Sequence, residues 1–159
     1  MKYSSVDRFD DFEFHDCEFT FVSWEDDRLV VSAKFLNIHK DAPQNNFGVD
    51  MELDKAQIIF HGFNIKEFEP SRTWKTDENG NSYTDDPLII YTDDKARSML
   101  KNELKSTAIV MGITYDSGEY ELGAIGIDPY FSVRFEITSL EIVWDDYRKI
   151  AWYESPKQG

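Results

Sequence analysis

Large apolar side chains recur at every second position over much of this chain, a spacing that restricts it to β-sheet structure. Phe131, Val133 and Phe135, for example, alternate with polar or charged neighbours. Successive side chains of a strand point to opposite faces, so such a segment buries one face and leaves the other in water. Similar runs elsewhere in the chain predict about eight to ten short strands.

Turn signals separate these runs. Asn79-Gly80 is the strongest short signal for a β-hairpin, and residues 25–28 have the composition of another turn. We also expect residues 145–148 to turn the chain and residues 150–153 to form a final strand.

The alternation changes phase at two places. Phe14 and Phe19 are five positions apart, an odd number, so an unbroken strand would put these two side chains on opposite faces. We therefore expect a bulge or short turn near residues 15–18. A second bulge or bend is expected near Ser139, where the phase shifts again.

One helix is predicted around residues 93–105, with Thr92 or Asp93 as its cap. Its apolar stripe at helical spacing consists of Ala96, Met99, Leu100 and Leu104. No βαβ unit and no glycine-rich phosphate loop is present in the sequence. The chain is thus expected to form a single β-rich domain over residues 1–159. Its expected fold is an antiparallel β-sandwich or a partly closed barrel, with one short helix.

The chain is strongly acidic. It has 31 Asp and Glu against 17 Lys and Arg, for a formal net charge of -14, while aromatic residues make up 15%. Disordered acidic tails lack large apolar side chains, so this charge is expected to coat a folded surface. A negative field repels nucleic acid and anionic membranes and attracts basic proteins. We therefore expect no nucleic-acid or membrane partner, and a basic protein as a possible partner.

Nothing in the sequence indicates export or membrane insertion. No stretch approaches the roughly 18 uncharged apolar residues of a membrane helix. The first residues also lack the apolar segment of a secretory signal. A cytoplasmic location is the expectation. Many cytosolic bacterial-type proteins are simply acidic, so a solvated surface without a dedicated partner remains an alternative.

More than half of the net charge lies in residues 7–27, where nine acidic side chains accompany a single base, Arg8. Phenylalanines in the same segment indicate strands, so we expect an acidic face there. Trp74 is the tryptophan expected to be exposed, because Arg72 and Lys75 are among its neighbours. The candidate binding residues are Asp10, Asp11, Glu13, Asp16, Glu18, Asp26, Asp27 and Trp74.

The single cysteine favours neither a disulfide nor nucleophilic catalysis. Cys17 has no second cysteine to pair with inside the chain. The adjacent carboxylates of Asp16 and Glu18 are expected to raise the pKa of its thiol, which makes the thiol less reactive. No serine-nucleophile motif is present. No catalytic residue is predicted.

Metal binding has equally weak support. His15 and Cys17 lie two positions apart, but no paired cysteine or histidine spacing typical of zinc is present. The sequence leaves open whether these two residues meet His39 or His61 in space. The acidic run that begins at Asp77 has its glycine two positions too early for a calcium loop. We predict no metal site and no cofactor.

Three functions remain. The first is a non-enzymatic binding protein that presents an acidic face to a basic protein partner, for example an immunity-like protein that neutralises a basic toxin. The alternative is a small-ligand or glycan-binding β module that uses a barrel mouth or exposed aromatic side chains. The third is a weak hydrolase with paired carboxylates. The oligomeric state is left open.

Overall fold

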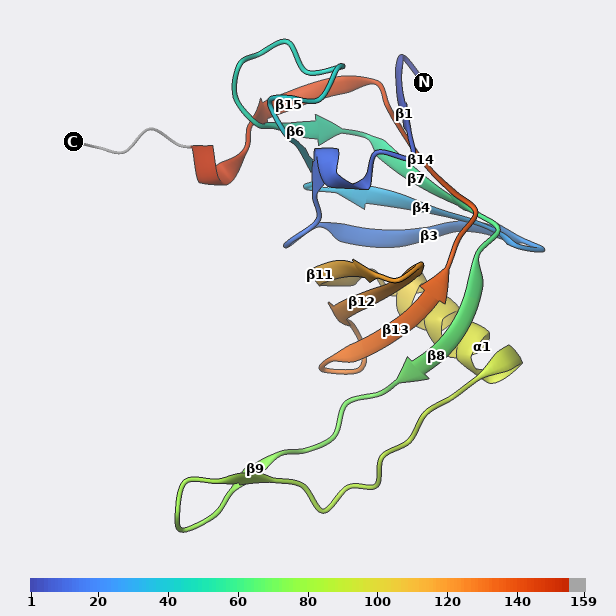
Figure 1. Ribbon diagram of the computed structural model, residues 1–159, viewed down its shortest axis with the longest axis vertical. Coiled ribbons are helices and arrows are strands. Elements are labelled where there is room, and N and C mark those ends of the chain that lie inside the picture. Colours follow the sequence, from blue (N-terminus) through green and yellow to red (C-terminus); the bar gives the residue numbers. More distant parts are fainter. Residues whose placement is uncertain (155–159) are drawn as a thin grey trace.

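A computed structural model describes residues 1–154 and is mainly β, as the alternation predicts (Figure 1). Within these residues the one α-helix, α1 (Asp93–Lys105), coincides with the predicted helix. Two short 3₁₀ helices are η1 (Phe9–Asp11) and η2 (Trp152–Glu154). The strands are β1 (Tyr3–Val6), β2 (Phe12–Glu13), β3 (Glu18–Glu25), β4 (Arg28–Lys34), β5 (Asn37–Ile38), β6 (Met51–Asp54), β7 (Ala56–His61), β8 (Asn64–Glu69), β9 (Lys75–Thr76), β10 (Ser82–Tyr83), β11 (Ala108–Asp116), β12 (Glu119–Ile125), β13 (Phe131–Glu136), β14 (Ser139–Trp144) and β15 (Asp146–Ile150).

Nine strands form one antiparallel sheet in the order β1-β14-β7-β4-β3-β11-β12-β13-β8. Figure 1 shows this sheet folded over, so that β14, β7, β4 and β3 lie above β11, β12, β13 and β8. The sheet is not closed into a barrel, which favours the sandwich among the two predicted folds. A four-stranded sheet, β15-β6-β5-β2, extends the upper part, and β9 pairs with β10 in a separate hairpin.

Two neighbouring strands carry the chain from one layer to the other, and they bend at the same place. β7 leads into β8 through Gly62, whose φ is +64°, and β13 leads into β14 through Thr138. The Thr138 N–H donates to the carbonyl of His61 at 2.8 Å, and the Thr138 hydroxyl donates to the same carbonyl at 3.1 Å. The predicted phase change near Ser139 is this bend.

The other predicted turns have mixed outcomes. The chain turns at Asp16, with a φ of 67°, and at the hairpin tip around Asp26, so both of those predictions are confirmed. The predicted turn at residues 145–148 is confirmed only at Asp145, where the chain bends between two sheets; it is wrong beyond that residue, because β15 already begins at Asp146 and pairs with β6. The expected final strand is also wrong, since η2 follows β15. Pairing with β6 outweighs the local turn preference of two adjacent aspartates.

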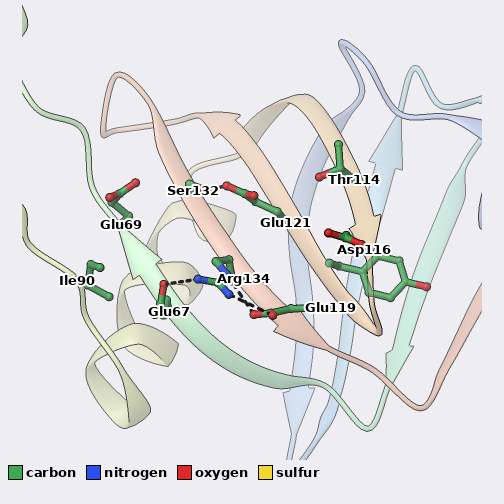
Figure 2. Close-up of a pocket in the computed structure, with 10 residues that line it drawn as sticks. Glu67, Glu69, Ile90, Thr114, Asp116, Glu119, Glu121, Ser132 and Arg134 are labelled. Carbon is green, nitrogen blue, oxygen red and sulfur yellow. Dashed lines mark hydrogen bonds and ion pairs between the residues drawn. The ribbon is translucent and has the colours of Figure 1, made fainter.

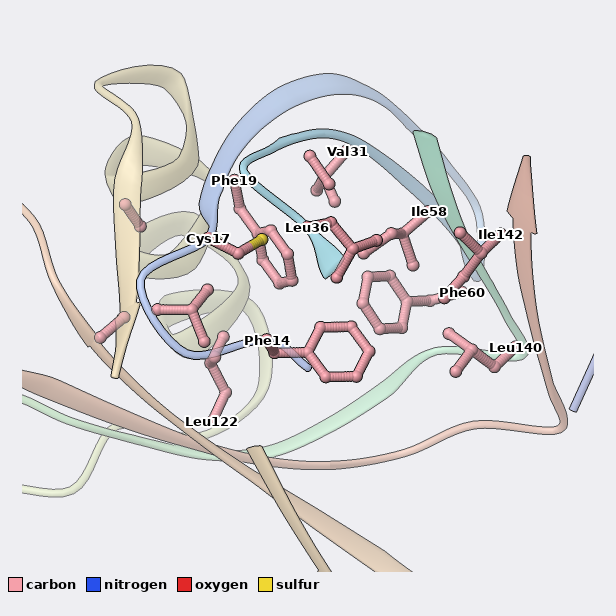
Figure 3. Close-up of a cluster of buried hydrophobic side chains, with 14 of the residues drawn as sticks. Phe14, Cys17, Phe19, Val31, Leu36, Ile58, Phe60, Leu122, Leu140 and Ile142 are labelled. Atoms are coloured by element: carbon pink, nitrogen blue, oxygen red, sulfur yellow. The ribbon is translucent and has the colours of Figure 1, made fainter. Parts of the chain in front are cut away.

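The core lies between the two layers and includes side chains of α1. Figure 3 shows Phe19, Phe60 and Leu122 converging from three different strands. Leu100 and Leu104 of α1 border the same apolar region. The gap left between these side chains is about 10 Å³, which is less than a small organic ligand needs. Among the described residues, this interior is therefore a packed core and offers no ligand cavity.

The shared bend yields a prediction about stability. A Cβ at position 62 would overlap the side chain of Thr138, and the positive φ adds backbone strain. We expect Gly62→Ala to lower the free energy of unfolding by more than about 2 kcal/mol, measured by urea denaturation. Gly80→Ala has the same type of φ but open space around it, so it should cost roughly 1 kcal/mol.

Gly112→Ala is the second control, since Gly112 has neither a positive φ nor a neighbour within 4 Å of an added Cβ. It should change stability by less than about 0.5 kcal/mol. If Gly62→Ala and Gly80→Ala lower the free energy of unfolding equally, the close packing of position 62 against Thr138 contributes nothing to stability.

Candidate functional site

The outer face of the lower layer is polar because β12, β13 and β8 turn their apolar side chains inward. Leu122, Val133 and Phe68 are buried on the inner face. Their sequence neighbours therefore point to the opposite face, where cross-strand pairing aligns Glu121 with Arg134 and Arg134 with Glu67. The polar half of the strand alternation thus builds one continuous surface.

This surface is concave and strongly acidic (Figure 2). It encloses a groove of about 420 Å³, named the acidic groove here. Five of its side chains are carboxylates and one is a guanidinium. The acidic groove is lined by Glu67, Glu69, Ile90, Thr114, Asp116, Glu119, Tyr120, Glu121, Ser132 and Arg134.

Arg134 joins two of the carboxylates across the groove. Its Nη1 donates to Glu67 Oε2 at 3.2 Å, and its Nε lies 3.1 Å from Glu119 Oε1. The hydrogen bond and charge of Glu119, followed by the charge of Glu67, raise the pKa of Arg134 above its ordinary value. The guanidinium therefore remains charged and is already engaged by two partners.

Three carboxylates of the acidic groove lack a basic partner. Glu121 accepts the Ser132 hydroxyl at 2.9 Å, and Asp116 accepts the hydroxyl of Ser117. Across residues 1–154, no lysine or arginine forms an ion pair with Glu69, Glu121 or Asp116. The groove consequently holds a surplus of negative charge that a cationic ligand would neutralise.

An apolar surface adjoins the acidic groove on the same face. Ile109 of β11 is paired directly with Ile125 of β12, and both side chains are exposed. Tyr130 is also exposed, and its ring lies where a side chain at Gly123 would project. With the exposed Met111, these residues form what we name the apolar zone: Ile109, Met111, Ile125 and Tyr130. An exposed apolar patch with polar residues at its rim is typical of a protein interaction site.

The structure does not gather the acidic residues of the N-terminal segment into one patch. Asp10 and Glu13 line a cavity of about 300 Å³, and Asp26 and Asp27 lie at the tip of the β3–β4 hairpin. Since β3 has eight residues, the hairpin tip is roughly 23 Å from the start of that strand, where Glu18 lies.

Two further candidates of that segment are held locally. Asp11 pairs with Arg8 at 3.0 Å, and Asp16 occupies the tight turn before β3. Outside the segment, Trp74 is exposed as predicted, with the guanidinium of Arg72 5.0 Å from its ring centre. None of these eight candidates lines the acidic groove.

The candidate metal and thiol residues are brought together only in part. His15 and His39 line the same cavity as Glu13, whereas His61 pairs with Glu141 at 3.0 Å. No three histidine, cysteine, aspartate or glutamate side chains of residues 1–154 are placed to hold a metal ion together. Cys17 is buried, and burial, with a smaller contribution from Glu18, raises the pKa of its thiol well above the ordinary value. The predicted direction is right, but burial is the main cause.

A buried carboxylate network escaped the sequence-based prediction. Asp50 accepts hydrogen bonds from His39 Nδ1 at 2.8 Å, from the Lys40 N–H at 2.7 Å and from the Tyr153 hydroxyl at 2.6 Å. Burial alone would raise the pKa of Asp50, but these three hydrogen bonds lower it below the ordinary value. The network ties η2 to the loop before β6, two segments that no spacing in the sequence connects.

The acidic groove also escaped prediction, because its carboxylates come from three strands, β8, β11 and β12, spread between residues 67 and 121. The sequence did contain one signal for the groove, namely the polar residues that alternate with apolar residues along those strands. Glu119 and Glu121 alternate with apolar residues and so share one face. Local acid density instead directed the prediction to residues 7–27.

Comparison with protein-family models, with curated proteins and with solved structures finds no match to this chain. Within the described part of the chain, no helix combines the length and the apolar character needed to cross a membrane.

The Asp50 network predicts a pH dependence. A carboxyl whose pKa is lowered by folding stabilises the protein above its unfolded pKa and loses that contribution as pH falls through the folded value. We expect the unfolding free energy of the native protein to drop as pH falls below about 4. Asp50→Asn should be less stable than the native protein at pH 6, and the gap between them should narrow at low pH.

Urea denaturation at a series of pH values measures this difference. Asp26→Asn is the matched control, because Asp26 lies in an exposed hairpin tip outside the network. A stability gap for Asp50→Asn that stays constant from neutral to acidic pH would contradict the assignment.

Proposed function

We propose that this chain is a non-enzymatic binding protein that presents an acidic face to a basic protein partner. The observation that carries the proposal is the acidic groove, where five carboxylates accompany one guanidinium in a concave surface. A concave surface lined by one sign of charge focuses its field on an approaching ligand of the opposite sign. The groove thus replaces residues 7–27 as the proposed centre of the acidic face.

The apolar zone supports a protein as the ligand rather than a free cation. Charge contributes mainly to the association rate and to specificity, whereas desolvated aromatic and apolar side chains contribute most of the affinity. Ile125, Ile109 and Tyr130 are positioned next to the charged groove to supply such contacts. An immunity-like protein that neutralises a basic toxin is one concrete form of this proposal.

The geometry gives less support to the other two hypotheses, the hydrolase and the small-ligand or glycan-binding module. A hydrolase needs two carboxyls that face each other across the bond to be cleaved, whereas the Arg134 guanidinium binds both Glu67 and Glu119 and so lies between this pair. A small-ligand module of the interior type would need more room than the core leaves. A glycan-binding role would depend on exposed aromatic side chains such as Trp74.

Neutralising part of the groove tests the proposal. The partner is the basic protein that the immobilised chain captures from its source cells at low salt, identified by mass spectrometry and then purified. We expect the triple variant Glu67→Gln/Glu119→Gln/Glu121→Gln to weaken binding of that protein at least tenfold by calorimetry, because it removes three negative charges at the interface. Binding should also weaken between about 50 mM and 500 mM salt.

The matched control is Glu25→Gln/Asp26→Asn/Asp27→Asn, which removes the same charge at the β3–β4 hairpin tip. It should weaken binding by no more than about twofold, through the overall field alone. Equal weakening by both triple variants would contradict the groove as the site. Capture of no basic protein at low salt would contradict the proposed function as a whole.

A further inference from the structure

A long arm, residues 70–91, leaves the body of the protein between β8 and α1 (Figure 1). Its tip is the β9–β10 hairpin, in which the Asp77 carboxylate accepts the N–H groups of Asn79 and Asn81. Further back, Lys75 pairs with Asp85 at 2.8 Å. The two limbs of the arm are therefore tied together although the arm has no apolar core.

Hydrogen bonds also fix the base of the arm beside the acidic groove. The Ser71 N–H donates to the Asp128 carboxylate at 3.1 Å. The buried Glu103 of α1 in turn accepts the N–H groups of Ile127 and Asp128 at 2.9 and 3.2 Å. On the other limb, Tyr91 exchanges two backbone hydrogen bonds of 2.9 Å with Phe68 of β8. Both limbs are thus held where they leave the sheet.

Residues 88–90 lie between the Lys75–Asp85 ion pair and the hydrogen bonds of Tyr91 with Phe68, and they are exposed. Leu88, Ile89 and Ile90 expose 57%, 42% and 42% of their surface. In the part of the chain that the structure describes, their backbone groups form no hydrogen bond with any other residue. Ile90 itself lines the acidic groove. Three consecutive apolar residues with free backbone donors and acceptors are a template for strand pairing.

We infer that residues 88–90 are a docking edge that pairs, strand against strand, with an extended basic segment of the protein partner. This inference rests on the proposed function and adds the mode of recognition to it. Added strands gain affinity from backbone hydrogen bonds and specificity from alternate side chains. Ile90 lines the groove, so the face of the added strand on that side would place lysine or arginine against Glu67 and Glu69. The opposite face would contact Ile89, which alternation places on the other side of the segment.

Charge decides against a second copy of this chain as the occupant. Each copy carries a formal charge of -14, and the arm itself contains Asp77, Glu78, Asp85 and Asp86. Pairing two such arms would bring like charges together, whereas a basic strand gains attraction at the same place. The partner segment is therefore expected to alternate basic and apolar residues.

A synthetic heptapeptide of alternating lysine and valine, blocked at both ends, serves as the probe. We expect it to bind at low salt, and a glutamate–valine peptide of the same length to show no binding. Two further probes carry N-methyl groups on the valines or on the lysines, which removes the backbone donors from one edge of the strand at a time. One of these two should bind at least tenfold more weakly than the parent peptide, and the other within about threefold of it.

Amide hydrogen exchange locates the contact. Tyr91 directs its N–H to Phe68, so strand alternation directs the N–H groups of Leu88 and Ile90 to the open edge. These two N–H groups should exchange rapidly in the free protein and at least tenfold more slowly with the parent peptide bound. Absence of peptide binding, or binding that leaves these amides unprotected, would overturn the inference. A dimer in sedimentation experiments that protects the same amides would also overturn it, by assigning the edge to a second copy.

The groove variant separates this inference from the proposed function. If both N-methylated peptides bind as well as the parent and Glu67→Gln/Glu119→Gln/Glu121→Gln abolishes binding, the groove attracts basic chains without strand pairing. In that case residues 88–90 are not a docking edge, and the acidic groove is still the binding surface. If strand pairing is observed and the groove variant binds the parent peptide as tightly as the native protein does, residues 88–90 are the docking edge and the acidic groove is not the binding surface.

Discussion

The fold depends on one close contact, the place where Gly62 and Thr138 bend together. Two neighbouring strands remain hydrogen-bonded to each other while both pass from the upper layer to the lower layer. A residue larger than glycine at position 62 would separate them, because the side chain of Thr138 occupies the space of a Cβ. This bend, together with the pairing of β3 with β11, sets the relative placement of the two layers, the core between them and the outer face of the lower layer.

The sequence was informative wherever local pattern decides structure. Period-two alternation predicted the strands, the spacing of Leu100 and Leu104 predicted α1, and the odd step after Phe14 predicted a turn at Asp16. Pairing partners were not predictable, since no local signal shows that residues 146–150 join the edge of β6. Tertiary pairing there overrides the turn preference of the aspartates.

The functional prediction failed to find the groove for a related reason. Acid density along the chain is highest at residues 7–27, but the fold spreads that segment over η1, β2, β3 and a hairpin tip. The acidic groove instead collects one or two acidic residues from each of several strands, such as Glu67 from β8 and Glu121 from β12, which are far apart in sequence. A sheet surface combines side chains from all of its strands. Charge counted along the chain therefore underestimates the charge that gathers on such a surface.

The hydrogen bonds at the base of the arm have a mechanical consequence. Glu103 is buried on α1, yet its carboxylate holds the turn that contains Asp128, and Asp128 holds Ser71. The helix, the turn and the arm are therefore linked in series. Whatever restrains the arm also restrains the turn and the helix behind the sheet. Rigidity gained at the surface would in this way reach the core, and its entropic cost would be shared by residues that a ligand never touches.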